Sequence, residues 1–389
     1  MAIDWSALSQ EAKPYIRAVS VYLCSRLIIL LAADFAGTYL TLWKPDLWQS
    51  GSRWYDHLLR WESEWYAGIA ERGYHYDGVP TGDLQPVVFY PAYPLLSRFL
   101  AEITGISPTV ARLVVANIAA VLAVLLLFRM VRRHFDDEVA LLSVALLSFY
   151  PGSLFLSAGY SEGLALLLIL CCFTLLDDRR YIAASVAAGL ALATRFVGIV
   201  LIPVLLWNLW LKFRADRRRF VVYAVACLLI ASAGLWTYML YLEMAFGHPF
   251  AFADAQAAFN GDTSLASRLI ASVTLQPLLR LRLTDFSPAG LDQWFFFLLL
   301  GLTLSAWRRL SVSLTLFSLG ALLVPYLTLG GGPAGFTSMT RFGVLAFPAF
   351  IVLAELCRRS ALLCFATLGL FGAVLALHSA LFAQWYWVG

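Results

Sequence analysis

Residues Val114–Phe128 read VVANIAAVLAVLLLF, and Arg129, Arg132 and Arg133 follow almost directly. The hydrocarbon core of a bilayer needs about 20 apolar residues per helix, and shorter runs are tolerated when a bundle shields them. Arginines collect at the cytoplasmic ends of such helices. The stretch therefore predicts a transmembrane helix that ends inside the cell.

Similar apolar runs recur from one end of the chain to the other. Hydrophobic residues make up 61% of the 389 residues and charged residues only 13%, and the mean hydropathy is +0.77. These values exclude a water-soluble globular fold. Because no linker rich in proline, glycine or serine separates the runs, residues 1–389 are expected to form a single polytopic membrane domain.

About eleven transmembrane spans are predicted, so the expected fold class is all-α integral membrane. Their approximate centres are Leu30, Leu122, Ala145, Leu168, Ala188, Val204, Leu228, Leu298, Phe317, Phe347 and Leu370. The two spans on either side of Arg195 lie so close together that they can also be read as one broken hairpin.

Cationic residues cluster in alternate short loops, and the clusters predict the orientation of the chain. They are Arg129 to Arg133, Arg179–Arg180, Lys212 to Arg219, Arg308–Arg309 and Arg358–Arg359. With these loops and the N-terminus in the cytoplasm, residues 44–107 and residues 247–292 form two long exterior segments. Trp385 to Trp387 are then expected at the exterior interface. The net charge of +4 is spread over loops, which gives no support for nucleic-acid binding.

The first exterior segment carries the densest group of polar and aromatic residues. It contains, in close succession, Trp54, Asp56, Arg60, Trp61, Glu62, Glu64, Trp65, Tyr66, Glu71, Arg72, Tyr74, His75 and Tyr76. On a helix, Trp61, Trp65 and Ile69 share one face. We expect this face to lie at the headgroup level, with a second amphipathic helix at Leu95–Ile103. The alternative is a solvated surface helix whose acids have no role.

Residues Trp61–Tyr74, WESEWYAGIAERGY, resemble the first-loop signature of the PIG-V family of mannosyltransferases, W-D-x-x-W-Y-x-x-I-A-x-x-G-Y. Further agreement follows in the same order at Phe89–Pro94, Phe149–Gly152, Tyr160–Glu162, Ala193–Arg195, Phe246–Pro249 with Phe252 and Gln256, and Thr340–Phe342 before Phe347 and Pro348. The resemblance covers most of the chain. Glu62 stands where the family usually has Asp, so the carboxylate is kept on a longer side chain.

The resemblance implies a bacterial multi-helix glycosyltransferase of the GT-C fold, in the inner (cell) membrane, with its active site on the periplasmic side. Its donor would be mannose or a similar hexose on a polyprenyl phosphate. Its acceptor would be a hydroxyl of a lipid or glycan, and the product anomer would be inverted. Membrane lipids are the other expected partners, and no cofactor is implied. Glucose or aminoarabinose on the same carrier stays open.

Transfer of this kind needs a base for the incoming hydroxyl, whereas the leaving phosphate needs cations more than an acid. The resemblance places Glu62 in the role of the base, with Glu64 and Asp56 as alternatives. Arg341 and Arg195 are candidate phosphate ligands, because a guanidinium can hold phosphate oxygens with two parallel hydrogen bonds. Either arginine can instead snorkel to the interface.

Further candidate substrate-binding residues lie in the exterior segments or at the ends of spans. They are Glu162, Tyr160, His75, Trp61, Trp65, Tyr66, Tyr90 and Gln256. Glu162 also fits a simple charge at a helix N-terminus, and Arg26, within the first span, fits an interhelical contact. The five histidines are scattered and the exterior segments hold no D-x-D pair, so no metal site is expected.

A transporter or flippase of a lipid-linked saccharide is the alternative function. Such a protein is expected to place ionisable groups near the middle of several spans. Here they gather toward one face of the membrane, which favours an enzyme that works at one interface.

Overall fold

The computed structural model describes residues 5–43, 53–78, 84–260, 265–275, 288–328 and 336–388, and every regular element in these ranges is helical. The longer helices are α1 (Trp5–Tyr39), α2 (Glu62–Arg72), α3 (Ala92–Thr104), α4 (Pro108–His134), α5 (Asp137–Phe149), α6 (Glu162–Asp177), α7 (Tyr181–Thr194), α8 (Leu201–Phe213), α9 (Arg217–Phe246), α10 (Ala251–Asn260), α11 (Leu265–Thr274), α13 (Pro288–Ala306), α14 (Val312–Thr328), α15 (Met339–Gly343), α16 (Phe347–Arg358) and α17 (Ala361–Ala383). Short helical turns are η1 (Asp56–Leu58), η2 (Pro86–Val88), η3 (Pro151–Leu156) and η4 (Phe196–Val200). The predicted all-α class is confirmed for these residues.

Five of the helical segments are long and apolar enough to cross a membrane, and the chain is an integral membrane protein. They are Glu11–Tyr39, Pro108–His134, Phe196–Phe213, Arg217–Phe246 and Ala361–Ala383. Every other predicted span centre also falls within a helix, but these helices are not among the five. The larger span count therefore stays a prediction.

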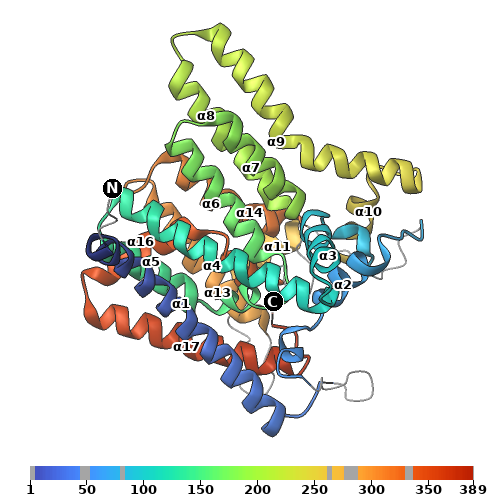
Figure 1. Ribbon diagram of the computed structural model, residues 1–389, viewed down its shortest axis with the longest axis vertical. Coiled ribbons are helices and arrows are strands. Elements are labelled where there is room, and N and C mark those ends of the chain that lie inside the picture. Colours follow the sequence, from blue (N-terminus) through green and yellow to red (C-terminus); the bar gives the residue numbers. More distant parts are fainter. Residues whose placement is uncertain are drawn as a thin grey trace.

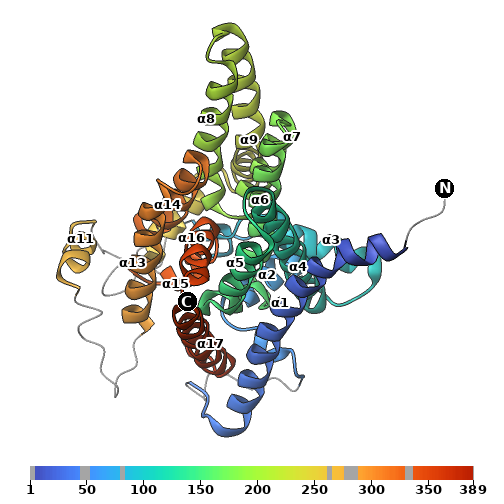
Figure 2. The same cartoon turned by 90° about the vertical axis from the view of Figure 1, so that its left-hand side faces the viewer.

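The helices form a bundle with a long pair of helices at each end (Figures 1 and 2). At one end α8 and α9 project together, and at the other α1 packs along α17. Between them, α16 occupies the centre of the bundle, and its residues Phe347 to Ala354 are all buried. Helices α2, α3 and α10 lie together at one side of the molecule in Figure 1, and this is where the candidate site is found.

Helix α4 shows how local sequence fixes an element. The Ser107 hydroxyl accepts a hydrogen bond from the Val110 amide at 3.3 Å, and Pro108 occupies the first turn. Both features favour a helix N-terminus. Arg132 and Arg133 lie in the last turn, where cations stabilise the negative end of the helix dipole.

Two buried contacts hold the bundle together. Helices α7 and α9 approach so closely that a Cβ atom on Gly234 would lie 2.3 Å from the backbone oxygen of Gly189, as in other membrane interfaces built from small residues. Arg26 donates to the backbone oxygens of Ser148 and Ser153 at 2.8 and 2.7 Å. It thus links α1 to α5 and η3, and the predicted interhelical role is confirmed.

The prediction for the first amphipathic helix is wrong for one part of its face. Helix α2 packs against α3 and α4, and Ile69 is only 1% exposed, so this face cannot lie along the membrane surface as a whole. The second predicted helix is confirmed as α3, and its exposed apolar residues include Leu95, Phe99 and Ile103. The exposed amphipathic face therefore belongs to α3.

Candidate active site

A cavity of about 1070 Å³ lies between α2, α10, α14 and the turn η4. The predicted site residues that line it are Glu62, Arg195, Trp61, Trp65, Tyr66, Tyr90 and Gln256, together with the alternative base Glu64. Much of the remaining wall is apolar and includes Val88, Phe89, Phe196, Phe252 and Val324. The cavity thus combines charged groups with a surface suited to a hydrocarbon chain.

Two carboxylates and two guanidinium groups alternate beside this cavity. The Arg341 Nη1 atom lies 2.7 Å from Glu62 Oε1, and its Nε donates to Glu162 Oε1. The same Glu162 oxygen accepts a hydrogen bond from Arg195 Nη1 at 2.7 Å. The order of contacts is therefore Glu62, Arg341, Glu162, Arg195, and the whole set is drawn from α2, α15, α6 and the end of α7.

Burial divides this chain of charges into an inner and an outer part. Glu162 and Arg341 are 0% and 1% exposed, whereas the side chains of Glu62 and Arg195 are 22% and 13% exposed. The rings of Tyr160 and Phe155 lie 4.6 and 5.0 Å from the Arg341 guanidinium carbon, close enough for cation–π contacts. Only the outer pair, Glu62 and Arg195, is among the residues that line the cavity.

A pair of hydroxyls extends the chain of contacts on the side of Arg195. The Ser161 hydroxyl accepts a hydrogen bond from Arg195 Nη1 at 3.0 Å and lies 3.0 Å from the Tyr66 hydroxyl. Burial raises the pKa of Tyr66 to about 12, so this phenol is neutral at physiological pH. Tyr66 can therefore donate a hydrogen bond at the cavity wall.

The residue before α2, which directly precedes Glu62, has an unusual backbone conformation. Trp61, the residue before the helix, has φ = 57°, a left-handed conformation that is uncommon for a bulky residue. Its indole is held by contacts with the rings of Trp43, Trp385 and Trp387, at centroid distances of 5.4 to 5.9 Å. Packing of the C-terminal tryptophans thus maintains a strained turn immediately before the candidate base.

Asp292 holds the short helix that carries Arg341. Its two carboxylate oxygens accept hydrogen bonds from the amides of Ser338 and Thr340 at 3.0 and 2.7 Å. Ser338 also has a positive φ of 67°. A Cβ atom on Gly152 would lie 2.2 Å from the Thr340 backbone oxygen, so only glycine fits there. Asp292 was not predicted as a site residue, because the charge pattern placed it at the end of the second exterior segment, whereas it lies inside α13.

Glu64 has a different environment from Glu62. Its side chain is 58% exposed and pairs at 3.5 Å with Arg112, which is 3% exposed. Arg112 also donates to the backbone oxygen of Ser63 and so ties the first turn of α2 to α4. Glu64 lines the cavity, but it has no contact with the Arg341 and Glu162 pair among the residues that the structure describes.

Five predicted residues, among them the buried Glu162, lie outside the cavity wall. Tyr160 and Arg341 are buried beneath it, and Tyr160 donates its hydroxyl to the Arg60 backbone oxygen at 3.0 Å. His75 is exposed and does not line the cavity. The alternative base Asp56 also lies outside the lining, and its side chain accepts from the Arg53 amide at 2.8 Å. Direct substrate contact by these five residues is therefore not what the geometry favours.

The described residues contain no cluster of three or more His, Cys, Asp or Glu side chains that could hold a metal ion. Near the cavity the cationic groups are guanidinium groups instead. The site can therefore bring a carboxylate and a fixed cation to one substrate.

The sequence of residues 85–237 matches the family described as dolichyl-phosphate-mannose-protein mannosyltransferase. This match covers less than half of the chain, and the PIG-V type suggested by the motifs stays a prediction. No curated protein matches the chain by sequence.

Two solved structures share the fold. The oligosaccharyltransferase of Archaeoglobus fulgidus in the apo form has a TM-score of 0.51 at 15% identity, over 96% of this chain and 56% of its own. ArnT from Cupriavidus metallidurans bound to undecaprenyl phosphate has a TM-score of 0.52 at 13% identity, over 95% of this chain and 76% of its own. The chain thus spans little more than half of the archaeal protein. These likenesses show that it has the fold of the GT-C membrane glycosyltransferases.

Proposed function

We propose that the chain is a glycosyltransferase that moves mannose, or a similar hexose, from a polyprenyl phosphate to a hydroxyl of a lipid or glycan. The observation that carries the proposal is the cavity in which the Glu62 carboxylate and the Arg195 guanidinium lie beside an apolar wall. The apolar wall suits the prenyl chain, and the charged groups suit the two ends of the reacting bond. The match to a mannosyltransferase family supports mannose as the sugar.

Glu62 is proposed as the base. Its carboxylate accepts the proton of the acceptor hydroxyl as the hydroxyl oxygen attacks the anomeric carbon. The bond from that carbon to the phosphate oxygen breaks, and the phosphate leaves with the bonding electrons. A single displacement of this kind inverts the anomeric configuration. Glu62 is favoured over Glu64 because it belongs to the chain of buried ion pairs and is therefore held in one position.

Arg195 is proposed to neutralise the leaving phosphate. Only one nitrogen, Nη1, is used in its contacts with Glu162 and Ser161, and the side chain lines the cavity. Arg341 is buried between Glu62 and Glu162, so we assign it a positioning role in place of direct phosphate binding. Its contact with Glu62 holds that carboxylate in place at the cavity wall.

The proposed topology places this cavity at the exterior face of a bacterial inner membrane. The segments that form it, α2 and α10, come from the two long connections that the arginine distribution assigns to the outside. Eleven spans, with α3 lying on the membrane surface by its exposed apolar face, complete the proposed arrangement.

A donor-consumption assay tests the proposal. The purified protein in lipid nanodiscs is given undecaprenyl-phosphate-mannose labelled in the sugar, together with a total lipid extract of membranes as acceptor. Wild type is expected to release undecaprenyl phosphate and to label a new product. Glu62→Gln should not, whereas Glu71→Gln, on the same helix but outside the cavity lining, should match wild type.

The same assay addresses the alternative function. In sealed vesicles, a flippase would move the labelled donor between leaflets without consuming it. Movement of intact donor, with no released undecaprenyl phosphate under any acceptor condition, would overturn the proposed transferase.

A further inference from the structure

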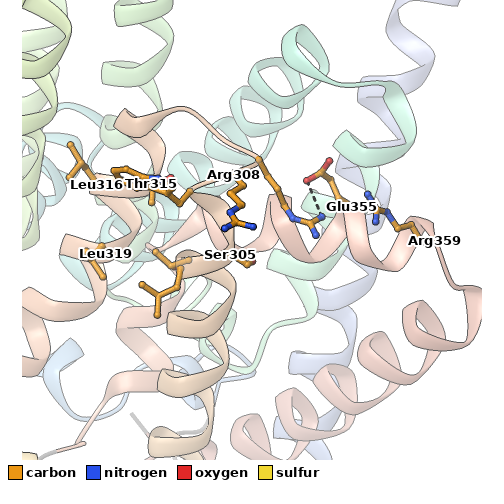
Figure 3. Close-up of a pocket in the computed structure, with 11 residues that line it drawn as sticks. Ser305, Arg308, Thr315, Leu316, Leu319, Glu355 and Arg359 are labelled. Atoms are coloured by element: carbon orange, nitrogen blue, oxygen red, sulfur yellow. Dashed lines mark ion pairs between the residues drawn. The ribbon is translucent and has the colours of Figure 1, made fainter.

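A second cavity, of about 910 Å³, lies where the loop between α13 and α14 meets the end of α16 (Figure 3). It is separate from the candidate active site and shares no lining residue with it. Both cavities border α14, the second at Thr315 to Leu319 and the first at Val324 to Thr328. At a rise of 1.5 Å per residue, Thr315 and Thr328 are roughly 20 Å apart, so the two cavities lie toward opposite ends of this helix.

The second cavity has a basic lining. Arg308, Arg309 and Arg359 face a single carboxylate, that of Glu355. Arg309 lies 3.9 Å from Glu355, whereas Arg308 and Arg359 form no ion pair with any residue in the described ranges. In the view of Figure 3, Arg308 and Arg359 lie on either side of Glu355. Two guanidinium groups that have no ion-pair partner in the described ranges therefore line the same cavity.

The rest of the lining combines three leucines and a tryptophan with the hydroxyl side chains of Thr303, Ser305 and Thr315. Leu316 and Leu319 of α14 lie on the side of the cavity away from Arg359 in Figure 3. Leu304 in the last turn of α13 and Trp307 just after the helix are each 62% exposed. Exposed leucine is ordinary on a helix that faces lipid, and tryptophan is enriched at the boundary between hydrocarbon and headgroups. The cavity thus has a basic part and an apolar part at a helix end.

We propose that this cavity binds an anionic phospholipid of the cytoplasmic leaflet. Arg308 and Arg359 hold the phosphodiester oxygens, and one acyl chain follows Leu316 and Leu319 along α14. Basic pockets between transmembrane helices on the cytoplasmic side are suited to phospholipid headgroups, and guanidinium groups bind phosphate through paired hydrogen bonds.

The charge pattern and the apolar wall select this ligand over a free anion. A soluble phosphate would use the arginines but leave the exposed Leu304 and the apolar side of the cavity without a partner. A zwitterionic lipid would supply the chain, but its cationic headgroup would oppose the two available arginines. The bound lipid would contact α13, α14 and α16 together and so stabilise the end of the bundle opposite the candidate active site.

Native mass spectrometry of the delipidated full chain tests the assignment. Phosphatidylglycerol and phosphatidylcholine with identical acyl chains are titrated separately, and inorganic phosphate is added as a competitor. Wild type should bind one phosphatidylglycerol at least tenfold more tightly than phosphatidylcholine, and millimolar phosphate should not displace it. Equal affinity for the two lipids would overturn the proposal, and displacement by phosphate would reassign the cavity to a free anion.

Matched double variants locate the site. Arg308→Gln with Arg359→Gln should weaken phosphatidylglycerol binding roughly tenfold or more, since each basic residue near a membrane surface contributes several-fold in affinity. Arg217→Gln with Arg218→Gln removes the same charge from the first turn of α9, which does not line the cavity, and should bind as wild type. An equal loss in both double variants would mean non-specific charge attraction. The lipid preference of the wild type is measured without any substitution. It can therefore refute the proposal even if a variant fails to fold.

Discussion

Glu162 is the residue whose replacement tests the buried chain of charges most severely. It is fully buried, and one of its oxygens accepts hydrogen bonds from both Arg195 and Arg341. Glu162→Gln keeps the shape of the side chain but removes the carboxylate that Arg195 and Arg341 share, and among the described residues Arg341 keeps its ion pair with Glu62 alone. Breaking a buried ion pair by removing one partner costs about 3–5 kcal/mol. Because the glutamine oxygen can still accept one hydrogen bond, we expect a loss near the lower end, about 3 kcal/mol.

The loss is measured as the change in free energy of unfolding in mixed micelles, followed by the fluorescence of the 13 tryptophans. Glu102→Gln is the matched control, because its carboxylate pairs with Arg98 at 2.8 Å but both side chains are at least half exposed. An exposed pair of this spacing on a helix contributes only about 0.3–0.5 kcal/mol. If Glu162→Gln were no less stable than Glu102→Gln, the inner charges would not hold α6 and α15 together and the positioning role of Arg341 would fail.

Three further predictions concern the topology, the two hydrogen bonds that Asp292 accepts, and metal ions. In a background without native cysteines, single cysteines at His75 and Asp254 should react with an impermeant thiol reagent in intact cells, and one at Asp216 should not; labelling at Asp216 would reverse the orientation. Asp292→Asn should lower the free energy of unfolding by about 1–3 kcal/mol and reduce turnover, because an amide group cannot accept from both the Ser338 and Thr340 amides. Unchanged stability and turnover would show that these two hydrogen bonds have no role. EDTA should leave donor consumption unchanged, since arginine supplies the cation in the proposed mechanism, and a loss restored by Mg²⁺ would contradict it.

The apolar pattern predicts the helices well. Each predicted span centre falls in a helix, and Glu162 begins α6 as expected. Helix α3 occupies Ala92–Thr104, close to the predicted Leu95–Ile103. These features depend on local hydrophobicity and on turn residues, which are visible in a single sequence. The burial of Ile69 was not predicted, because a helix in a connecting segment can place its apolar face against either lipid or protein.

The sequence predicted several residues of the candidate site but not the contacts between them. Glu62, Arg195, Glu162 and Arg341 were each identified, yet the sequence gives no sign that Arg341 joins two carboxylates or that it is buried. Such contacts depend on how α2, α6 and α15 meet in space. Asp292 could have been identified from the sequence, because a lone carboxylate at the start of an apolar span is costly unless it has a specific partner.

Donor turnover by Glu62→Gln, compared with Glu64→Gln, tests the proposed mechanism most directly. At saturating undecaprenyl-phosphate-mannose, loss of a general base slows transfer by roughly two to four powers of ten, while the affinity for the donor should persist because Arg195 is unchanged. Glu64→Gln should retain most of the wild-type rate, since Glu64 is largely exposed and paired with Arg112. Wild-type turnover by Glu62→Gln, together with an inactive Glu64→Gln, would contradict the assignment and move the base to Glu64.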